Sequence, residues 1–281
     1  MLNEELVKKI AASKKYKGVY LKTIARIVED CARKYQEKQI EKKAKNLLHQ
    51  VWGAYFSTPL NFKKLFEKFE QTTKIVGGPT SHNLKKAVLP LLQIQSSIEE
   101  RIPILDDFYK EIFKITGKPK TIVDLGSGLN PLTFLWMDLA KDAQYFAFDI
   151  DKNQAEFLKS VFKNLNINQV KINLGDILID EFPETDIAFF LKVLPPLERQ
   201  LKGSSLKALQ KQNSKFLVVS FPTKSISGKQ KGMVDFYTKW FQDLIKDQQW
   251  KTEKILFKSE LVFIIARSDI SSIPLIIKKY D

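Results

Sequence analysis

Cysteine and histidine are almost absent from this chain of 281 residues, which holds one cysteine, Cys31, and two histidines, His49 and His82. A single cysteine excludes a disulfide within the chain and a cysteine cage around a metal. Cys31 lies on an apolar helical stripe, where a small buried thiol is expected. Two histidines argue against a histidine metal site and a Ser-His-Asp triad. We therefore expect no bound metal.

Long apolar runs are also missing. No window approaches the roughly 18 uninterrupted apolar residues of a transmembrane helix, and residues 1–18 lack the apolar centre of a signal peptide. We expect a cytoplasmic monomer with no membrane partner. A chain of this length can bury a substantial core and form one large domain, or one large domain and a smaller one.

Acidic residues are outnumbered by basic ones, which gives a formal net charge of +14. Residues 1–50 carry 13 basic and 6 acidic side chains, residues 101–200 carry 12 and 15, and residues 201–250 carry 9 and 3. A solvated lysine-rich surface would explain any single basic run. Two basic segments around a slightly acidic centre suit a polyanion better, because each neutralised phosphate releases counterions and adds affinity.

Residues 1–95 show helical periodicity and no strand alternation. Two apolar stripes at three-and-four spacing predict the core of a small helical bundle. They comprise Leu21, Ile24, Ala25, Val28, Cys31, Ala32 and Tyr35, and then Ile40, Ala44, Leu47, Leu48, Val51, Trp52 and Tyr55. Phe62, Leu65, Phe66 and Phe69 are also helix-spaced, so we interpret them as core and not as platforms for stacked bases. The lysines proposed to face RNA are Lys14, Lys15, Lys42, Lys43 and Lys45.

Thr72–Thr80 is the best linker candidate and a domain boundary is expected near it, because its paired glycines and proline break periodic structure. From Lys120, short apolar runs alternate with helical segments, which predicts a parallel sheet covered by helices. The expected strands are 122–125, 145–150, 168–174, 186–191 and 215–221, closed by an antiparallel pair at 254–257 and 260–266. We predict a small basic all-helical domain over residues 1–95 and an α/β, Rossmann-like domain over residues 96–281.

The stretch Thr121–Pro131 (TIVDLGSGLNP) is the clearest local motif. An apolar strand turns through Gly126 and Gly128, which permit backbone torsions closed to other residues and let a ligand approach the main chain. Pro131 then suits the first position of a helix. The dinucleotide fingerprint would need a third glycine where Pro131 stands, and a tight connection without a ligand is the alternative interpretation.

Acidic residues at the strand ends indicate which cofactor fits. Asp149, with Asp151 as second choice, follows the second strand where a carboxylate binds ribose hydroxyls. Asp124 beside the turn would repel a pyrophosphate but tolerate a cationic sulfonium. Asp176 could bind an adenine edge and Arg101 a carboxylate, so we predict S-adenosylmethionine. The alternatives are that Asp149 and Asp151 cap the next helix and that Asp176 turns a loop.

Six segments, in order along nearly the whole chain, carry a wider resemblance. They are Leu48–Tyr55 (LHQVWGAY), Ser96–Tyr109 (SSIEERIPILDDFY), Asp124–Pro131 (DLGSGLNP), Phe148–Asp151 (FDID), Phe190–Pro195 (FLKVLP) and Ser220–Met233 (SFPTKSISGKQKGM). Together they are similar to the aminoglycoside-resistance methyltransferases that modify N7 of a guanine in the decoding region of 16S rRNA. Ser127 stands where many relatives carry cysteine. Residues 71–90 resemble an insertion, which leaves open whether this chain confers drug resistance or has a related role.

The resemblance implies a methyltransferase domain behind a helical domain that docks on the small ribosomal subunit and its 16S rRNA. The residues we predict at the cofactor are Arg101, Asp124, Gly126, Gly128, Asp149, Asp151, Asp176 and Leu191. Those we predict around the target base are Lys192, Ser220, Pro222, Lys224, Ser225 and Lys229, with Lys231 as a further RNA contact. A non-catalytic ribosome-binding or assembly factor that keeps the fold is the main alternative, and a small-molecule methyltransferase is a third hypothesis.

Methylation of guanine N7 predicts a site without an acid or base residue. N7 carries an in-plane lone pair and no proton, so the enzyme needs only to position the reactants. We expect Lys192 to reach phosphate or sugar, since a cation next to N7 would oppose the charge that develops there. The target nucleotide must leave its stack, and the segment Lys224–Gly232 is the candidate to hold it.

Overall fold

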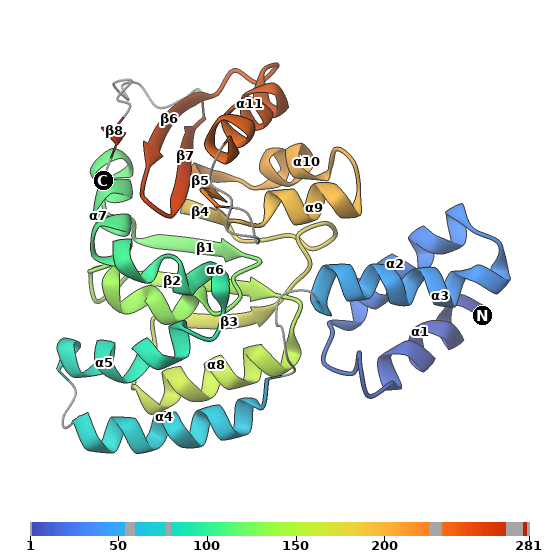
Figure 1. The fold of residues 1–281 in the computed structure, drawn as a ribbon, viewed down its shortest axis with the longest axis horizontal. Helices are drawn as coiled ribbons and strands as arrows, with labels where there is room; N and C mark the ends of the chain where they lie inside the picture. The colour runs from blue at the N-terminus through green and yellow to red at the C-terminus, as the bar shows by residue number, and fades with distance from the viewer. Residues whose placement is uncertain (1, 54–59, 77–79, 225–231, 268–277, 280–281) are drawn as a thin grey trace.

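The computed structural model describes residues 2–53, 60–76, 80–224, 232–267 and 278–279. Their centre is an eight-stranded sheet in the order β3-β2-β1-β4-β5-β7-β6-β8 (Figure 1). The strands are β1 (Thr121–Leu125), β2 (Gln144–Asp149), β3 (Val170–Leu174), β4 (Thr185–Leu191), β5 (Ser214–Pro222), β6 (Lys251–Leu256), β7 (Glu260–Ala266) and β8 (Lys278–Lys279). β1 to β5 are parallel, and β7 runs antiparallel to β5 and β6. The predicted α/β sheet is confirmed, with β8 added at its edge.

Helices cover both faces of the sheet because its strands alternate between two buried faces. Ile122 of β1 and Phe189 of β4 belong to one core, and Val123 and Phe190 belong to the other. On the first face lie α5 (Ser81–Leu92), α7 (Leu105–Thr116), the 3-10 helix η3 (Asn130–Trp136) and α8 (Lys152–Asn164). On the second lie α9 (Leu194–Gln200), α10 (Ser204–Lys211) and α11 (Met233–Ile245).

A separate helical unit at the N-terminus has its own core. It comprises α1 (Leu2–Ala12), α2 (Leu21–Lys34), α3 (Glu37–Leu48) and a π-helix (His49–Gly53). The two predicted stripes meet there, since Ile24 and Val28 of α2 pack with Ala44 and Leu48 of α3. Leu21 and Tyr35, at the two ends of α2, are exposed, and Tyr55 lies outside the described residues. Figure 1 shows this unit beside the sheet and away from strands β6 and β8.

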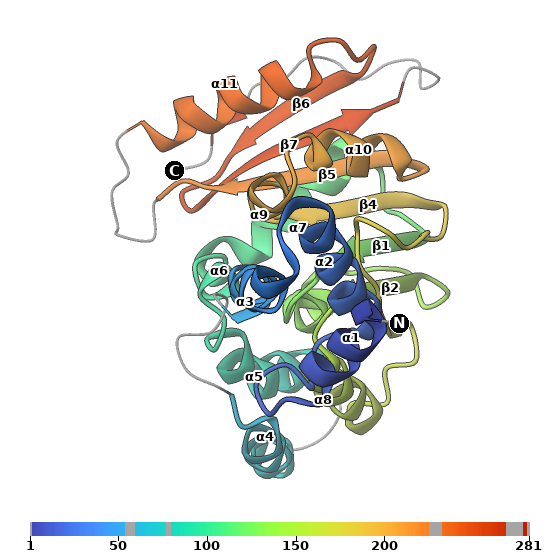
Figure 2. The ribbon, with the colours of Figure 1, turned by 90° about the vertical axis from the view of Figure 1, so that its right-hand side faces the viewer.

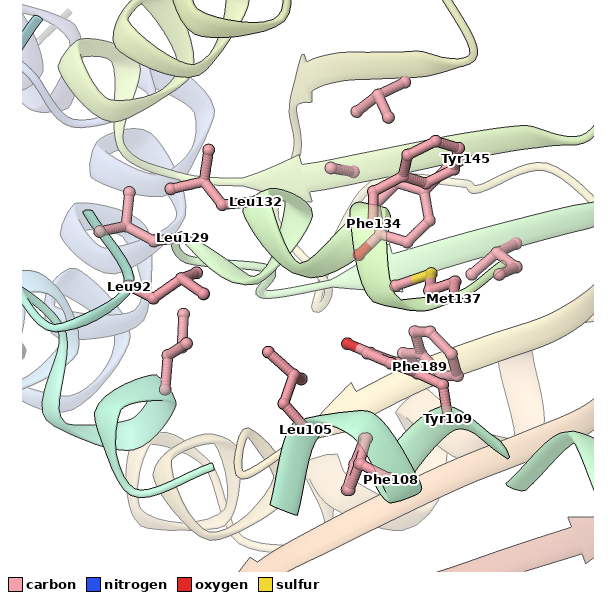
Figure 3. Close-up of a cluster of buried hydrophobic side chains, with 14 of the residues drawn as sticks. Leu92, Leu105, Phe108, Tyr109, Leu129, Leu132, Phe134, Met137, Tyr145 and Phe189 are labelled. Carbon is pink, nitrogen blue, oxygen red and sulfur yellow. The ribbon is translucent and has the colours of Figure 1, made fainter. Parts of the chain in front are cut away.

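The boundary between the two cores falls earlier than the sequence suggested. α4 (Phe62–Val76) and α5 come before residue 95, yet their apolar side chains join the core of the sheet and not that of the N-terminal unit. Phe69 of α4 is buried there, and Phe62 contacts Phe157 of α8 with ring centroids 5.1 Å apart. Figure 3 shows Leu92 of α5 beside Leu129 in the same cluster. Helical periodicity reports a buried face but not the element it packs against, so the predicted boundary at residue 95 is late.

Three short elements connect this framework to the site. They are α6 (Ser96–Glu99), the 3-10 helix η2 (Ile102–Ile104) and η3, which follows the glycine turn where the sequence predicted a helix with Pro131 at its first position. Across the described residues, no helix has the length and apolar character needed to cross a bilayer. The same residues contain no group of three or more His, Cys, Asp or Glu side chains suited to a metal ion.

The packing of α4 on the sheet domain predicts a large effect of Phe69→Ala. Phe69 is 2% exposed, whereas Ile75 on the same helix is 82% exposed. We expect Phe69→Ala to lower the free energy of unfolding by about 3–5 kcal/mol through lost burial and a residual cavity. Ile75→Ala should change it by less than about 0.5 kcal/mol. Urea titration measures both, and a loss under about 1 kcal/mol for Phe69→Ala would contradict this placement of α4.

Candidate active site

A pocket lies at the carboxyl ends of the parallel strands, where ligands bind in open α/β sheets. Its floor comes from β1, β2 and β4 and its rim from the N-terminal unit and α9. The lining residues are Arg26, Val51, Trp52, Gln95, Ser97, Gly126, Gly128, Asp149, Ile150, Asp151, Gln154, Gly175, Asp176, Ile177, Leu191, Lys192, Val193, Pro196, Leu197 and Gln200. Figure 2 views the molecule from the side of this edge, with α2 and α3 in front of the strands.

The glycine turn forms the floor of the pocket and leaves no room for side chains. Gly126 and Gly128 have φ values of +68° and +53°, in the left-handed region that favours glycine. A Cβ on Gly126 would lie 2.7 Å from Val193 Cγ2, and one on Gly128 would lie 2.6 Å from Gln95 Nε2. Gln95 also fixes the turn, because its Oε1 accepts a hydrogen bond from Leu129 N at 2.8 Å. Val193 and Gln95 therefore occupy the space of a Cβ, and the turn lines the pocket with main-chain atoms.

Asp149 joins this turn to the end of β2. Its Oδ2 accepts a hydrogen bond from Gly128 N at 2.9 Å, and its Oδ1 accepts one from Asp151 N at 3.0 Å. Burial raises the pKa of Asp149 above its ordinary value, against the lowering effect of these backbone donors. The carboxylate lies in the pocket wall, where its remaining lone pairs can accept hydrogen bonds from a ligand.

Asp151 has a structural role as well as a place in the pocket. It is the N-cap of α8, with Oδ1 accepting from Gln154 N at 3.0 Å, as the alternative interpretation of the sequence held. Its Oδ2 accepts from Trp52 Nε1 at 2.9 Å, which holds the indole of the N-terminal unit at the pocket wall. Burial raises the pKa of Asp151 to about 6.

Asp124 does not line the pocket formed by the described residues, which corrects its predicted place at the cofactor. It points to the opposite face of β1 from Val123 and Leu125, into a buried polar cluster with Tyr145 and Asn130. Asn130 Nδ2 donates to Asp124 Oδ2 at 2.8 Å, and the Tyr145 hydroxyl donates to the same oxygen. Strand alternation sends every second side chain away from a given face, and the sequence placed Asp124 by proximity alone.

Arg101 also lies behind the pocket and not on its wall. Its guanidinium donates two hydrogen bonds to Glu260 of β7, from Nε to Oε2 at 2.8 Å and from Nη2 to Oε1 at 2.6 Å. A third bond joins Nη1 to Asn130 Oδ1 at 2.6 Å. The pair is buried and bidentate, so Arg101 is held by protein partners where the sequence suggested a cofactor carboxylate. Burial opposes ionisation of Glu260, but Arg101 and then Lys192 hold its pKa below the ordinary value.

Lys192 links this buried pair to the pocket. It has φ +60°, and its ammonium donates to Ser97 O at 2.9 Å and Glu100 Oε2 at 2.7 Å. Glu260 Oε2 lies 3.7 Å away. Two carboxylates therefore balance the charge of Lys192 at the pocket wall. The side chain that the sequence assigned to phosphate or sugar is bonded to α6 and its C-cap in this structure.

The other residues predicted around the target base are dispersed. Ser220 is fully buried in β5 beside Glu260 and does not line the pocket of the described residues. Pro222 ends β5, and Lys224 follows it on the exposed surface. Ser225, Lys229 and Lys231 lie outside the described residues, as does most of the Lys224–Gly232 segment.

The five lysines predicted to face RNA all belong to the N-terminal unit. Lys14, Lys15, Lys42 and Lys43 are exposed. Lys15 lies over the Tyr16 ring and Lys43 over the Tyr35 ring, at 5.4 and 4.9 Å from the centroids. Lys45 is half-buried and bonds Glu41 Oε1 at 2.7 Å, so it is less available than the others.

The residues predicted from the sequence form one side of the pocket, and the residues of the other side were not predicted. Gly126, Gly128, Asp149, Asp151, Asp176, Leu191 and Lys192 meet around it as the strand ends indicated. The missed rim includes Arg26, which lies outside both predicted apolar stripes. The sequence does hold a signal for Trp52 and Gln95. Trp52 belongs to a segment with family resemblance, and Gln95 directly precedes another such segment.

Strand order, glycine turn and acidic strand ends define the class of this protein, a Rossmann-like S-adenosylmethionine-dependent methyltransferase. Residues 12–264 match the family model "Ribosomal RNA methyltransferase (FmrO)". The chain belongs to this family.

Individual relatives agree with this assignment. The chain is 34% identical over 273 residues to a 16S rRNA (guanine(1405)-N(7))-methyltransferase of Proteus mirabilis, covering 94% of this chain and 97% of the relative. A protein of the same description from Micromonospora echinospora is 30% identical over 268 residues, with 94% and 96% covered. The solved structure of the 16S rRNA methylase RmtB superposes with a TM-score of 0.74 at 26% identity, covering 95% of this chain and 98% of that one. A structure of RmtF in complex with S-adenosyl-L-homocysteine shares the fold, with a TM-score of 0.77, 23% identity, and coverage of 95% and 98%.

The buried position of Asp124 predicts a pH-dependent stability. Burial raises the pKa of Asp124 from 3.8 to about 6. Between about pH 4 and pH 6 the unfolded chain loses this proton while the native chain keeps it. The free energy of unfolding therefore falls as pH rises through this range. Over this range we expect wild type to lose about 1–3 kcal/mol more unfolding free energy than Asp124→Asn. Urea titrations from pH 4 to 7 compare the two, and identical pH dependence would contradict the shift.

Proposed function

We propose that this chain transfers a methyl group from S-adenosylmethionine to N7 of a guanine in the decoding region of 16S rRNA. The guanine is the equivalent of position 1405, for which the relatives from Proteus mirabilis and Micromonospora echinospora are described. The observation that carries the proposal is the pocket at the strand ends, whose glycine turn and Asp149 lie in a chain that matches those relatives over 94% of its length. Methylation at this position is proposed to give aminoglycoside resistance.

The pocket fits S-adenosylmethionine better than a dinucleotide. Its wall carries the carboxylates of Asp149, Asp151 and Asp176, which suit ribose hydroxyls, an adenine amino group and a cationic centre but oppose a pyrophosphate. Gly126 and Gly128 line the pocket without side chains, so a flat ligand can approach their main-chain atoms. When bound, the cofactor supplies a methyl group activated by a sulfonium. We assign the ribose to Asp149 and the adenine to Asp176.

For this reaction the protein must position the reactants and balance the charges around them. Guanine N7 has a lone pair and no proton, so no residue is needed as general base. Holding the reactants in line can contribute roughly 7–11 kcal/mol to lowering the barrier. Positive charge develops on the guanine, and the pairing of Lys192 with Glu100 and Glu260 keeps an uncompensated cation away from it.

The partner is the small ribosomal subunit, and we assign its docking to the basic N-terminal unit through Lys14, Lys15, Lys42 and Lys43. The segment that includes Lys224 and Lys229 follows β5 and is proposed to hold the flipped guanine. A monomer acting in the cytoplasm completes the proposal. The competing proposal is a non-catalytic assembly factor that binds the subunit without methyl transfer.

Methylation of isolated small subunits tests the proposal directly. We expect label from S-adenosylmethionine to enter 16S rRNA, and reduction followed by aniline cleavage to map it to one guanine N7. Label on an exocyclic amino group would show a different reaction. Subunit binding without transfer would favour the assembly factor.

Substitution of Asp149 tests the cofactor assignment. Asp149→Asn keeps the size of the side chain but places an amide in a wall where Gly128 N and Asp151 N also donate. We expect calorimetry to show the dissociation constant for S-adenosylhomocysteine rising by about tenfold to a hundredfold, the loss of a charged hydrogen bond. Asp106→Asn, whose side chain is 87% exposed on α7, serves as the control and should not change it. Unchanged affinity in Asp149→Asn would show that the ribose contact is misplaced.

A further inference from the structure

Arg26 enters the cofactor pocket from the N-terminal unit. It lies on α2, and its side chain is 10% exposed. Its Nε donates to Asp176 Oδ2 at 3.0 Å, and its Nη2 donates to Gln200 Oε1 at 3.2 Å. Nη1 is also 3.6 Å from Asp30 Oδ2 on its own helix. One guanidinium thus joins α2, the loop after β3 and the end of α9 at the pocket rim.

Asp176 is held from two sides by this arrangement. Oδ1 accepts from Leu178 N at 2.9 Å, and Oδ2 accepts from Arg26. The carboxylate side chain is 4% exposed and lines the pocket. A carboxylate has about four acceptor positions, so two protein donors leave it able to accept a further hydrogen bond. The two donors fix the plane of the carboxylate and hence the direction in which that bond points.

We propose that Arg26 is a positioning residue for adenine recognition, which orients Asp176 to accept the 6-amino group and makes the N-terminal unit part of the cofactor site. This inference rests on the proposed function, because it takes S-adenosylmethionine as the cofactor. The planar fork of arginine suits the task, since it holds Asp176 and Gln200 at once. A guanidinium has no acceptor, so the adenine amino group is bound by Asp176 and not by Arg26 itself.

A neighbouring ion pair provides a matched control for simple tethering. Lys22, one helical turn before Arg26 on α2, donates to Asp180 Oδ1 at 2.7 Å. This pair joins α2 to the same loop, but the Lys22 side chain is 62% exposed and the pair does not line the cofactor pocket of the described chain. If the N-terminal unit only needs attachment, loss of either pair should leave the preference for adenine unchanged. If Arg26 orients Asp176, only Arg26 should change adenine recognition.

Binding of two ligands by the full chain tests the proposal. S-adenosylhomocysteine carries the 6-amino donor, and S-inosylhomocysteine carries a carbonyl oxygen in its place. In calorimetry we expect wild type to prefer the adenosyl ligand by about tenfold or more, because the inosyl ligand leaves a buried acceptor unpaired. We expect Arg26→Ala to raise the dissociation constant of S-adenosylhomocysteine about tenfold and to reduce the preference at least about threefold. Lys22→Ala should stay within about twofold of wild type on both measures.

Three outcomes in the two alanine variants would overturn the proposal. They are unchanged affinity in Arg26→Ala, equal weakening of both ligands with the preference kept, and a matching loss in Lys22→Ala. Thermal unfolding establishes that each variant folds. Arg26→Lys keeps the charge but not the fork, so its affinity should fall between wild type and Arg26→Ala, and wild-type values for it would also overturn the role. RNA is absent from these measurements, so a chain that binds cofactor but methylates no guanine would fail the proposed function without failing this test.

Discussion

The carboxylate of Asp149 accepts hydrogen bonds from two backbone amides that belong to different turns, and the site is built around this contact. Gly128 N comes from the turn after β1, and Asp151 N comes from the start of α8. One side chain therefore sets the distance between the glycine turn and the next helix. Because β1 and β2 are neighbours in the sheet, this position is available only at their carboxyl ends. The ribose assignment depends on the same two oxygens.

A buried polar cluster supports the pocket from behind. Arg101 binds Glu260 with two hydrogen bonds and reaches Asn130, which in turn contacts Asp124. The ion pair connects β7, at the far side of β5, to the segment that precedes β1. Removing one partner of such a pair leaves an uncompensated buried charge, so each residue depends on the other. Lys192 touches Glu260 as well, so the pocket wall and this cluster are one network.

Much of the sheet could be predicted because its strands are short apolar runs whose ends carry Asp149, Asp176 and Lys192. The side of the pocket that the N-terminal unit forms could not be predicted. Arg26 follows the helical period of a surface residue, and only the docking of α2 turns it inward. Asp124 was misplaced because adjacency in sequence says nothing about the face of a strand. Residues 62–92 were grouped with the wrong core for a related reason, since periodicity identifies a buried stripe without naming its partner.

We propose that this site positions a methyl donor against a nucleophile that has no proton to lose. The most direct measurement is the single-turnover rate of methyl transfer to small subunits between pH 7 and 8.5, above the pKa of about 6 assigned to Asp124 and Asp151. We expect a rate that is constant within about twofold, because no general base titrates in the reaction. A tenfold rise per pH unit would contradict it and would indicate that a proton must be removed from the acceptor.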